Sequence, residues 1–284
     1  MIKVEKLEFT YPKSNTKALN GVDFQIQKGE IFGFLGPNGA GKSTTQKVII
    51  GLLKNYHGNV EILGKNLRNW KKDLYEKIGV CFELPNHYQK LSAYENLELF
   101  GSFYSRRTLK PMELLKMVEL EKDANRRVAT FSKGMRTKLN FARALLNTPE
   151  ALFLDEPTTG LDPVSARLIK NLILQKKKEG TTIFLTTHNM NDADELCDRV
   201  GFIVDGRLVL VKNPRDLKIS HGKKIVKVEY LNDEELQSQE FNLGNLWSNN
   251  GFINLLKSGQ VQTIHTAEAT LEDIFIKVTG RKLR

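Results

Sequence analysis

The sequence predicts an α/β fold in which helices cover a mostly parallel sheet. Short apolar runs typical of strands alternate with segments of helical periodicity between residues 22 and 204, and such alternation is typical of parallel sheets. Only helical periodicity occurs over residues 93–147, so we expect a helical subdomain inserted at about residues 84–150. The pattern changes after Pro214, which predicts a main domain, residues 1–214, and a small α+β accessory region, residues 215–284.

The individual elements follow from the spacing of the apolar residues. Expected strands are 22–26, 31–35, 58–63, 78–82, 151–154, 182–185 and 199–204, and 226–230 in the accessory region. Helices are expected at 42–53 and 163–178, the second with Asp162 as N-cap and Pro163 at its first position. Thr270 and Asp273 have capping-box spacing before an apolar stripe, which predicts an amphipathic helix at the end of the chain.

Composition excludes several classes of protein. Hydrophobic residues make up 40% and charged residues 27% of the 284 residues, which argues against disorder, collagen-like repeats and disulfide scaffolds. No apolar run approaches the ~18–20 residues that span a bilayer, and the first residues lack the apolar core of a secretory signal. We therefore expect a cytoplasmic protein. Cys81 and Cys197 lack metal or redox spacing and are interpreted as small buried hydrophobes.

The chain carries 43 Lys+Arg against 33 Asp+Glu, a formal net charge of +10. Such an excess fits nucleotide phosphates, nucleic acid or the anionic cytoplasmic leaflet of a membrane. Charge alone does not choose between these partners, so the choice depends on motifs.

Residues 36–43 read Gly-Pro-Asn-Gly-Ala-Gly-Lys-Ser and match the phosphate-binding pattern G-x-x-x-x-G-K-[ST] between an apolar strand and a helix. Glycines let backbone N–H groups converge on phosphates, and the helix directs its positive end toward them. The sequence predicts nucleotide binding, with Lys42 on the outer phosphates and Ser43 on Mg²⁺. The predicted loop residues are Gly36, Pro37, Asn38, Gly39, Ala40, Gly41, Lys42, Ser43 and Thr44.

Two adjacent carboxylates, Asp155 and Glu156, follow the apolar strand 151–154. The carboxyl end of a parallel strand faces the ligand crevice, so this pair is expected beside the phosphate loop. Asp155 can orient Mg²⁺, and Glu156 can accept a proton from the attacking water. These roles predict ATP hydrolysis with Mg²⁺ as the cofactor.

The segment Phe131-Ser132-Lys133-Gly134-Met135 places an N-cap serine at the start of a helix, which is a second anion site. At this position the chain resembles the nucleotide-binding subunits of ABC transporters, whose signature motif lies between the phosphate loop and the acidic strand. The resemblance covers about residues 1–215. It implies a P-loop ATPase of the ABC type, with an antiparallel β subdomain beside the parallel sheet.

The remaining motifs of this family occur in the expected order. Residues 158–163 resemble the D-loop, with Asp162 at its acidic position; His188 is similar to the switch histidine that contacts the γ-phosphate. Tyr11 resembles the aromatic residue that stacks on adenine. The resemblance implies catalytic roles for Glu156 and His188, and contacts from Ser132, Lys133, Gly134 and Met135 to the ATP of a second subunit.

Two positions depart from the family pattern. Glu83 stands where the Q-loop glutamine is usual, and its carboxylate can still act as a Mg²⁺ ligand. Lys133 and Met135 replace the usual glycine and glutamine of the signature, while Ser132 and Gly134 are kept. Such variants, and the ending at residues 270–280, resemble ATPases of exporters of drugs, antibiotics and related compounds.

The resemblance implies a homodimer, or a pair with a similar ATPase chain, that drives a separate integral-membrane permease. It would place the protein in the cytoplasm, peripheral on the inner face of the membrane. An alternative is an ABC protein acting on ribosomes or nucleic acid, but neither tandem cassettes nor long coiled coils are present, so no nucleic-acid partner is expected. A kinase or GTPase would leave Ser132 and His188 unexplained. The transported substance, its direction and the permease are not defined by the sequence.

Overall fold

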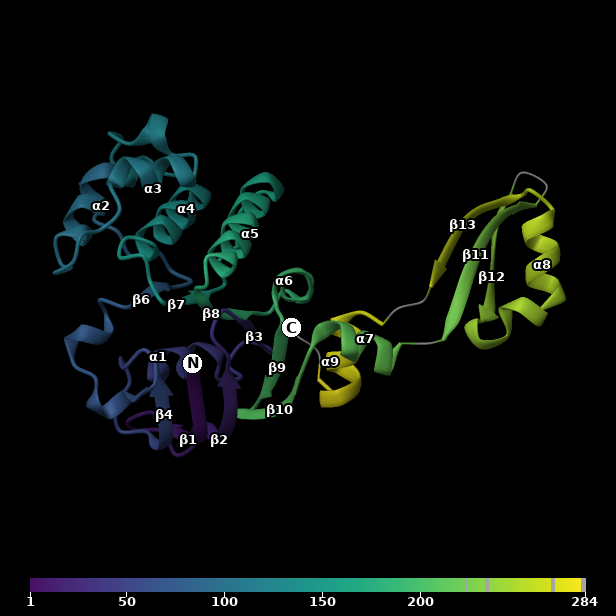
Figure 1. The fold of residues 1–284 in the computed structure, drawn as a ribbon, viewed down its shortest axis with the longest axis horizontal. Helices are drawn as coiled ribbons and strands as arrows, with labels where there is room; N and C mark the ends of the chain where they lie inside the picture. The colour runs from purple at the N-terminus through teal and green to yellow at the C-terminus, as the bar shows by residue number, and fades with distance from the viewer. Residues whose placement is uncertain (223, 233–234, 267–268, 282–284) are drawn as a thin grey trace. The chain divides into compact units, whose positions relative to one another are not determined.

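A computed structural model of the chain describes residues 1–222, 224–232, 235–266 and 269–281 (Figure 1). It contains two compact units, Met1–Asn213 and Pro214–Arg281. No helix in the described ranges has both the length and the apolar character needed to cross a membrane.

A six-stranded sheet in the order β10-β9-β3-β8-β7-β6 forms the centre of the first unit. Five of its strands are parallel, and β10 pairs antiparallel with β9 at one edge. The strands are β3 (Ile31–Leu35), β6 (Ile78–Cys81), β7 (Ala151–Asp155), β8 (Thr182–Thr187), β9 (Arg199–Val204) and β10 (Arg207–Lys212). The predicted parallel sheet is confirmed, and every residue of β3, β7 and β8 is buried, as in sheets covered on both faces.

A second, antiparallel sheet has the strand order β2-β1-β4-β5, which confirms the expected β subdomain. Its strands are β1 (Ile2–Thr10), β2 (Lys17–Ile26), β4 (His57–Ile62) and β5 (Lys65–Asn66). Phenylalanine rings join the two sheets in one core: Phe24 of β2 stacks on Phe32 of β3 with 5.3 Å between ring centres, and Phe184 of β8 lies beside both. This shared core fixes the antiparallel sheet against the parallel one.

The helices of the first unit are α1 (Lys42–Ile49), α2 (Ala93–Gly101), α3 (Pro111–Met117), α4 (Lys133–Ala144), α5 (Pro163–Lys178) and α6 (Met190–Leu196). Helices α2, α3 and α4 lie together in Figure 1, and the segment between α3 and α4 contains two short 3₁₀ turns at 121–123 and 128–130. One expected helix, residues 42–53, was too long. Its last turn closes at Gly51, where φ is +76°, and the Leu52 amide donates to the carbonyl of Lys47. A left-handed residue of this kind is a common helix end.

The second unit contains the three-stranded antiparallel sheet β12-β11-β13 and three helices. Its elements are α7 (Pro214–His221), β11 (Ile225–Asn232), β12 (Glu235–Asn242), α8 (Asn250–Lys257), β13 (Val261–Thr266) and α9 (Leu271–Thr279). Val226 and Val228 of β11 form a small core with Phe241, whose ring lies 5.3 Å from Phe252 of α8. Helices α7 and α9 pack on each other, and the capping box between Thr270 and Asp273 is formed as predicted.

Candidate nucleotide-binding site

The predicted phosphate loop joins β3 to α1. A side chain at Gly36 would place its Cβ only 2.2 Å from the Ile203 carbonyl oxygen, and Gly41 has a φ of +111°. Both positions therefore require glycine. Asn38 and Gly39 are exposed at the tip of the loop. The loop thus presents its backbone N–H groups, and the N-terminus of α1, to the same region.

Lys42 lies at the first position of α1 and is 7% exposed. Its ammonium group donates to the carbonyl oxygens of Gly36 at 2.7 Å and Pro37 at 3.1 Å. Burial lowers the pKa of Lys42, and the nearby carboxylates of Glu156, Asp155 and Glu83 act in the opposite direction. The loop therefore holds a cation at its centre, positioned to exchange loop carbonyls for phosphate oxygens.

Hydroxyl and carboxylate oxygens meet at the expected metal position. Ser43 Oγ lies 3.3 Å from Asp155 Oδ1, and the Thr186 hydroxyl donates to the same carboxylate oxygen. Mg²⁺ prefers such oxygen ligands and keeps several waters, so one hydroxyl and one nearby carboxylate suit it. Glu83 is exposed and makes no hydrogen bond or ion pair within the described ranges, although its charge reaches Lys42. The structure therefore brings Ser43 and Asp155 together and leaves the Glu83 carboxylate available.

Glu156 is 6% exposed and has a φ of +50°, which is unusual for a residue with a side chain. One carboxylate oxygen accepts from the His188 amide at 2.9 Å and lies 2.7 Å from His188 Nδ1. The other accepts from the hydroxyls of Thr159 at 3.1 Å and Thr187 at 3.0 Å. This network fixes the carboxylate beside the exposed His188 ring.

The sequence predictions do not include the two threonines around Glu156. Their position at the ends of strands could have indicated them, because β7 and β8 are adjacent parallel strands that end at the same edge of the sheet. Thr187 is the last residue of β8, and Thr159 comes three residues after Glu156.

Tyr11 lies next to the first turn of α1. Its hydroxyl is 3.1 Å from Thr44 Oγ1, and its ring meets Phe9 edge to face with 5.0 Å between ring centres. The ring is 39% exposed. An aromatic face is therefore available beside the phosphate loop, where a base can stack on it.

The signature segment forms the exposed N-terminus of α4. Ser132 is the N-cap, and its hydroxyl accepts from the Met135 amide at 3.2 Å. The Lys133 side chain lies over Gly160, where an added Cβ would be 2.6 Å from Lys133 Cε. Asp162 caps α5 by accepting from the amides of Val164 and Ser165, and its hydrogen bonds with Ser165 lower the pKa of the Asp162 carboxyl. Helix α4 thus presents an exposed N-terminus, which can complement an anion, with residues 160–162 beside it.

Comparison with known proteins identifies the family. The "ABC transporter" family model matches residues 19–159. The fluoroquinolones export ATP-binding protein of Mycobacterium tuberculosis (strain CDC 1551 / Oshkosh) is 52% identical over 284 residues, covering 100% of this chain and 94% of that protein. The chain belongs to the ABC transporter family.

Other comparisons extend this assignment. The bacitracin transport ATP-binding protein BcrA of Bacillus licheniformis is 34% identical, covering 98% of this chain and 97% of that protein. The dimeric, post-hydrolysis structure of the ATP-binding cassette MJ0796, bound to ADP and Pi, superposes with a TM-score of 0.69 at 31% identity; the match covers 75% of this chain and 98% of that one. Residues 224–268 match the model "Fluoroquinolone efflux ABC transporter C-terminal domain".

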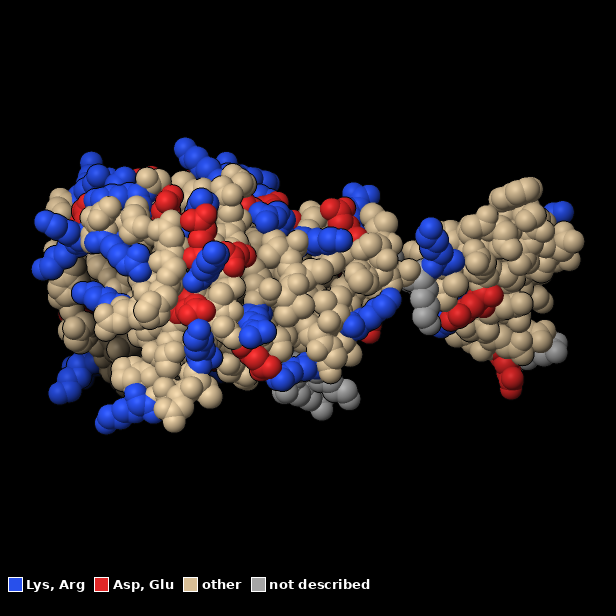
Figure 2. Space-filling view, turned by 90° about the horizontal axis from the view of Figure 1, so that it is seen from below, with Lys and Arg blue, Asp and Glu red and all other residues tan. Residues whose placement is uncertain are grey.

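This ABC protein is the ATP-binding subunit of a transporter, and it hydrolyses ATP with Mg²⁺. As the ATP-binding subunit of a transporter, it acts together with a membrane partner. On the face in Figure 2, Lys and Arg of the first unit are interspersed with Asp and Glu.

Proposed function

We propose that two copies of this chain bind ATP between them and thereby drive a permease that exports fluoroquinolone-like drugs. The single observation that carries the choice of drug is the 52% identity to a fluoroquinolones export protein over the whole chain. The match of residues 224–268 to the corresponding C-terminal model supports it independently of the ATPase motifs.

A shared ATP site is supported by two exposed anion sites on one subunit. The phosphate loop at α1 holds one side of the nucleotide, and Ser132 at α4 offers a second helix N-terminus. Each can complement the negative charge of a triphosphate. The similar cassette MJ0796 has been solved as a dimer bound to ADP and Pi. We propose that Ser132, Lys133, Gly134 and Met135 complete the site of the partner subunit.

The geometry supports the following residue roles. Lys42 and the loop amides bind the phosphates, while Ser43, Asp155 and Glu83 would hold Mg²⁺, which would neutralise phosphate charge. Glu156 accepts a proton from water, because its hydrogen bonds with Thr187 and His188 hold the carboxylate in a fixed orientation. His188 lies at 2.7 Å from Glu156 and is exposed toward solvent, so it can contact the outer phosphate. Tyr11 stacks on the base.

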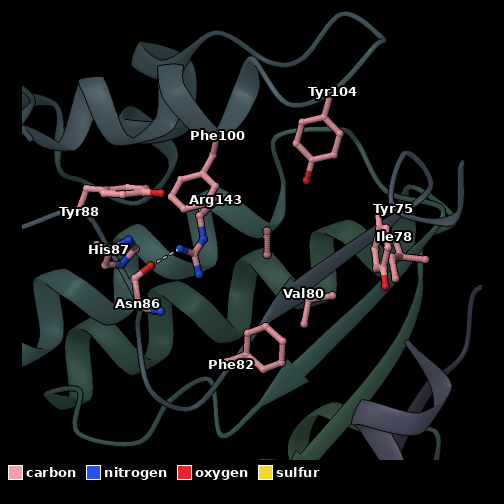
Figure 3. Close-up of a pocket in the computed structure, with 11 residues that line it drawn as sticks. Tyr75, Ile78, Val80, Phe82, Asn86, His87, Tyr88, Phe100, Tyr104 and Arg143 are labelled. Carbon is pink, nitrogen blue, oxygen red and sulfur yellow. Dashed lines mark hydrogen bonds between the residues drawn. The ribbon is translucent and has the colours of Figure 1, made fainter. Parts of the chain in front are cut away.

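A cavity of about 530 Å³ between β6 and the α2–α4 group is the proposed docking site for the permease (Figure 3). Its wall contains Phe82, Tyr88 and Phe100, and the Arg143 guanidinium lies 4.5 Å from the centre of the Phe100 ring. Tyr88 is 53% exposed at the rim. Aromatic side chains and an arginine in a concave surface are typical of interface anchors.

Export can be tested by drug accumulation. A susceptible bacterium that expresses this chain with its permease should accumulate less fluoroquinolone than the same strain with the Glu156→Gln variant. Bacitracin susceptibility, measured in parallel, tests the second candidate suggested by the 34% identical relative. Equal fluoroquinolone accumulation in the two strains would contradict the proposed drug.

A further inference from the structure

A second cavity lies in the first unit, away from the phosphate loop. It measures about 660 Å³ and is formed by residues 51–56 after α1 and residues 67–75 before β6. Its lining combines cations, aromatic rings and leucines: Gly51, Leu53, Lys54, Asn55, Tyr56, Leu67, Arg68, Trp70, Lys71, Lys72, Leu74 and Tyr75. None of the proposed ATP contacts belongs to this set. We call it the basic cavity.

The basic cavity has an unbalanced charge. Four cations, Lys54, Arg68, Lys71 and Lys72, line it, and no carboxylate does so among the described residues. None of the four makes an ion pair within the described part of the chain. Elsewhere in the first unit many lysines are paired, for example Lys77 with Glu150 at 2.8 Å. Four unpaired cations around one cavity favour an anion, and one with several negative oxygens.

Apolar and aromatic groups make up the rest of the wall. Arg68 stacks on the Tyr56 ring at 4.6 Å and donates to the carbonyl oxygens of Tyr56 and Gly58. Trp70 donates its indole N–H to the Ile62 carbonyl at 3.0 Å, which fixes the ring. Leu52, between the lining residues Gly51 and Leu53, is 52% exposed. Tryptophan, tyrosine and exposed leucine beside lysines are typical of a surface that meets the headgroup region of a membrane.

Tyr56 lines the basic cavity and is 8% exposed, and its hydroxyl is buried without a hydrogen-bond partner among the described residues. Because that oxygen has almost no accessible surface, a ligand in the cavity meets the surrounding cations and aromatic rings rather than this hydroxyl.

The position of the basic cavity indicates what covers it. Tyr75 lines both this cavity and the proposed permease-docking cavity, so the two adjoin on the same side of the unit. We propose that the basic cavity binds the headgroup of an anionic phospholipid in the membrane that holds the permease. The orientation rests on the proposed function, since permease docking brings this side to the bilayer. The phosphate binds the lysines, and the Trp70 side faces the acyl boundary.

Vesicle binding tests the proposal without the permease. The full chain is floated with phosphatidylglycerol vesicles or with phosphatidylcholine vesicles. We expect binding to the anionic vesicles only, weakened by salt. The variant Lys54→Gln/Lys71→Gln/Lys72→Gln should lose about 100-fold in partitioning, because each lysine near an anionic surface contributes about fivefold. Retained ATP binding shows that the variant is folded.

A control variant removes the same number of positive charges at a site away from the basic cavity. Lys110, Lys116 and Lys122 are exposed in the helical part and make no ion pair within the described ranges. Lys110→Gln/Lys116→Gln/Lys122→Gln should keep most of the vesicle binding. An equal loss in both variants, or in neither, would overturn the proposal.

Tryptophan fluorescence localises the contact. The chain has two tryptophans, and Trp247→Phe leaves Trp70 alone as the reporter. Its emission should shift to the blue with phosphatidylglycerol vesicles and stay unchanged with phosphatidylcholine. An unshifted spectrum would remove the basic cavity from the contact.

Two further arms separate other ligands. If glycerol phosphate or inorganic phosphate displaces the vesicles at the lipid's own concentration, the cavity binds soluble phosphate and the lipid assignment is wrong. If the triple variant binds vesicles normally but no longer co-purifies with the permease in neutral lipid, the occupant is an acidic permease segment. Failure of the proposed function would give a different result: the unmodified chain would bind anionic vesicles but show no permease-dependent ATPase activity.

Discussion

Replacing Glu156 by glutamine isolates the role of its charge, because the structure lets an amide occupy the same position. The amide oxygen can keep the His188 N–H, and the amide nitrogen then faces the hydroxyls of Thr159 and Thr187, which rotate to accept. At most one hydrogen bond is lost, about 1 kcal/mol. The variant should therefore fold and bind ATP with nearly unchanged affinity.

Catalysis should respond far more strongly than stability. A general base contributes about 10²–10⁴-fold, which is about 3–5 kcal/mol of the barrier. We expect kcat of Glu156→Gln to fall by that factor, measured as phosphate release from Mg-ATP at saturation. Size-exclusion chromatography with Mg-ATP should show a dimer that persists, because the bound nucleotide is not consumed.

The control is Thr159→Val, which removes one hydrogen bond to the same carboxylate and keeps its charge. Losing one such bond corresponds to about a fivefold decrease in rate. Turnover of Glu156→Gln within tenfold of the unmodified protein would show that another group takes the proton.

Substitutions at three further positions test the proposed ATP site and the proposed docking cavity. Ser132→Arg should abolish hydrolysis yet leave ATP binding by the isolated monomer intact, measured by nucleotide titration at low protein concentration; loss of monomer binding would contradict a site shared between subunits. Tyr11→Ala should weaken ATP binding about fivefold, since an aromatic stack contributes about 1 kcal/mol. Tyr11→Phe should bind ATP nearly normally, and an equal loss of affinity in both variants would assign the role to the hydroxyl. Burial lowers the pKa of His87 from 6.5 to about 4. Its contribution to the free energy of unfolding is therefore complete above pH 6.5 and declines as pH falls toward 4, because the unfolded chain then binds the extra proton. The difference in the free energy of urea unfolding between pH 7.5 and pH 5 should be smaller for His87→Gln than for the unmodified protein, and an unchanged difference would assign the titration to another group.

Features that depend on neighbouring residues could be predicted from the sequence. The N-caps at Ser132, Asp162 and Thr270 form as expected, because each needs only a side chain and an amide two or three residues away. The strand–loop–helix around Gly36–Ser43 is equally local. The end of α1 was predicted less well, since the apolar periodicity continues past Gly51 although the backbone turns there.

Features that join distant segments could not be predicted in the same way. Thr187 and Glu156 are 31 residues apart and meet only because β7 and β8 pair in parallel with Asp155 opposite Thr186. The buried Tyr56 hydroxyl gives no signal in the sequence, since its lack of a partner depends on how the segments around it fold. Such contacts follow from the tertiary register, which a single sequence specifies weakly.

One such long-range arrangement connects the docking cavity to the catalytic machinery. Asn140 of α4 donates to the Phe82 carbonyl at 2.7 Å, and Arg143 of the same helix donates to the Asn86 carbonyl at 2.6 Å. These bonds tie both ends of the segment that carries Glu83 to helix α4, whose N-terminus is the signature serine. If a permease segment enters the proposed docking cavity at Asn86, we expect it to act on this segment and on α4 together, so that Glu83 and Ser132 shift in one step. Because packed elements shift as units rather than deform gradually, this connection gives a physical route from the membrane partner to the nucleotide.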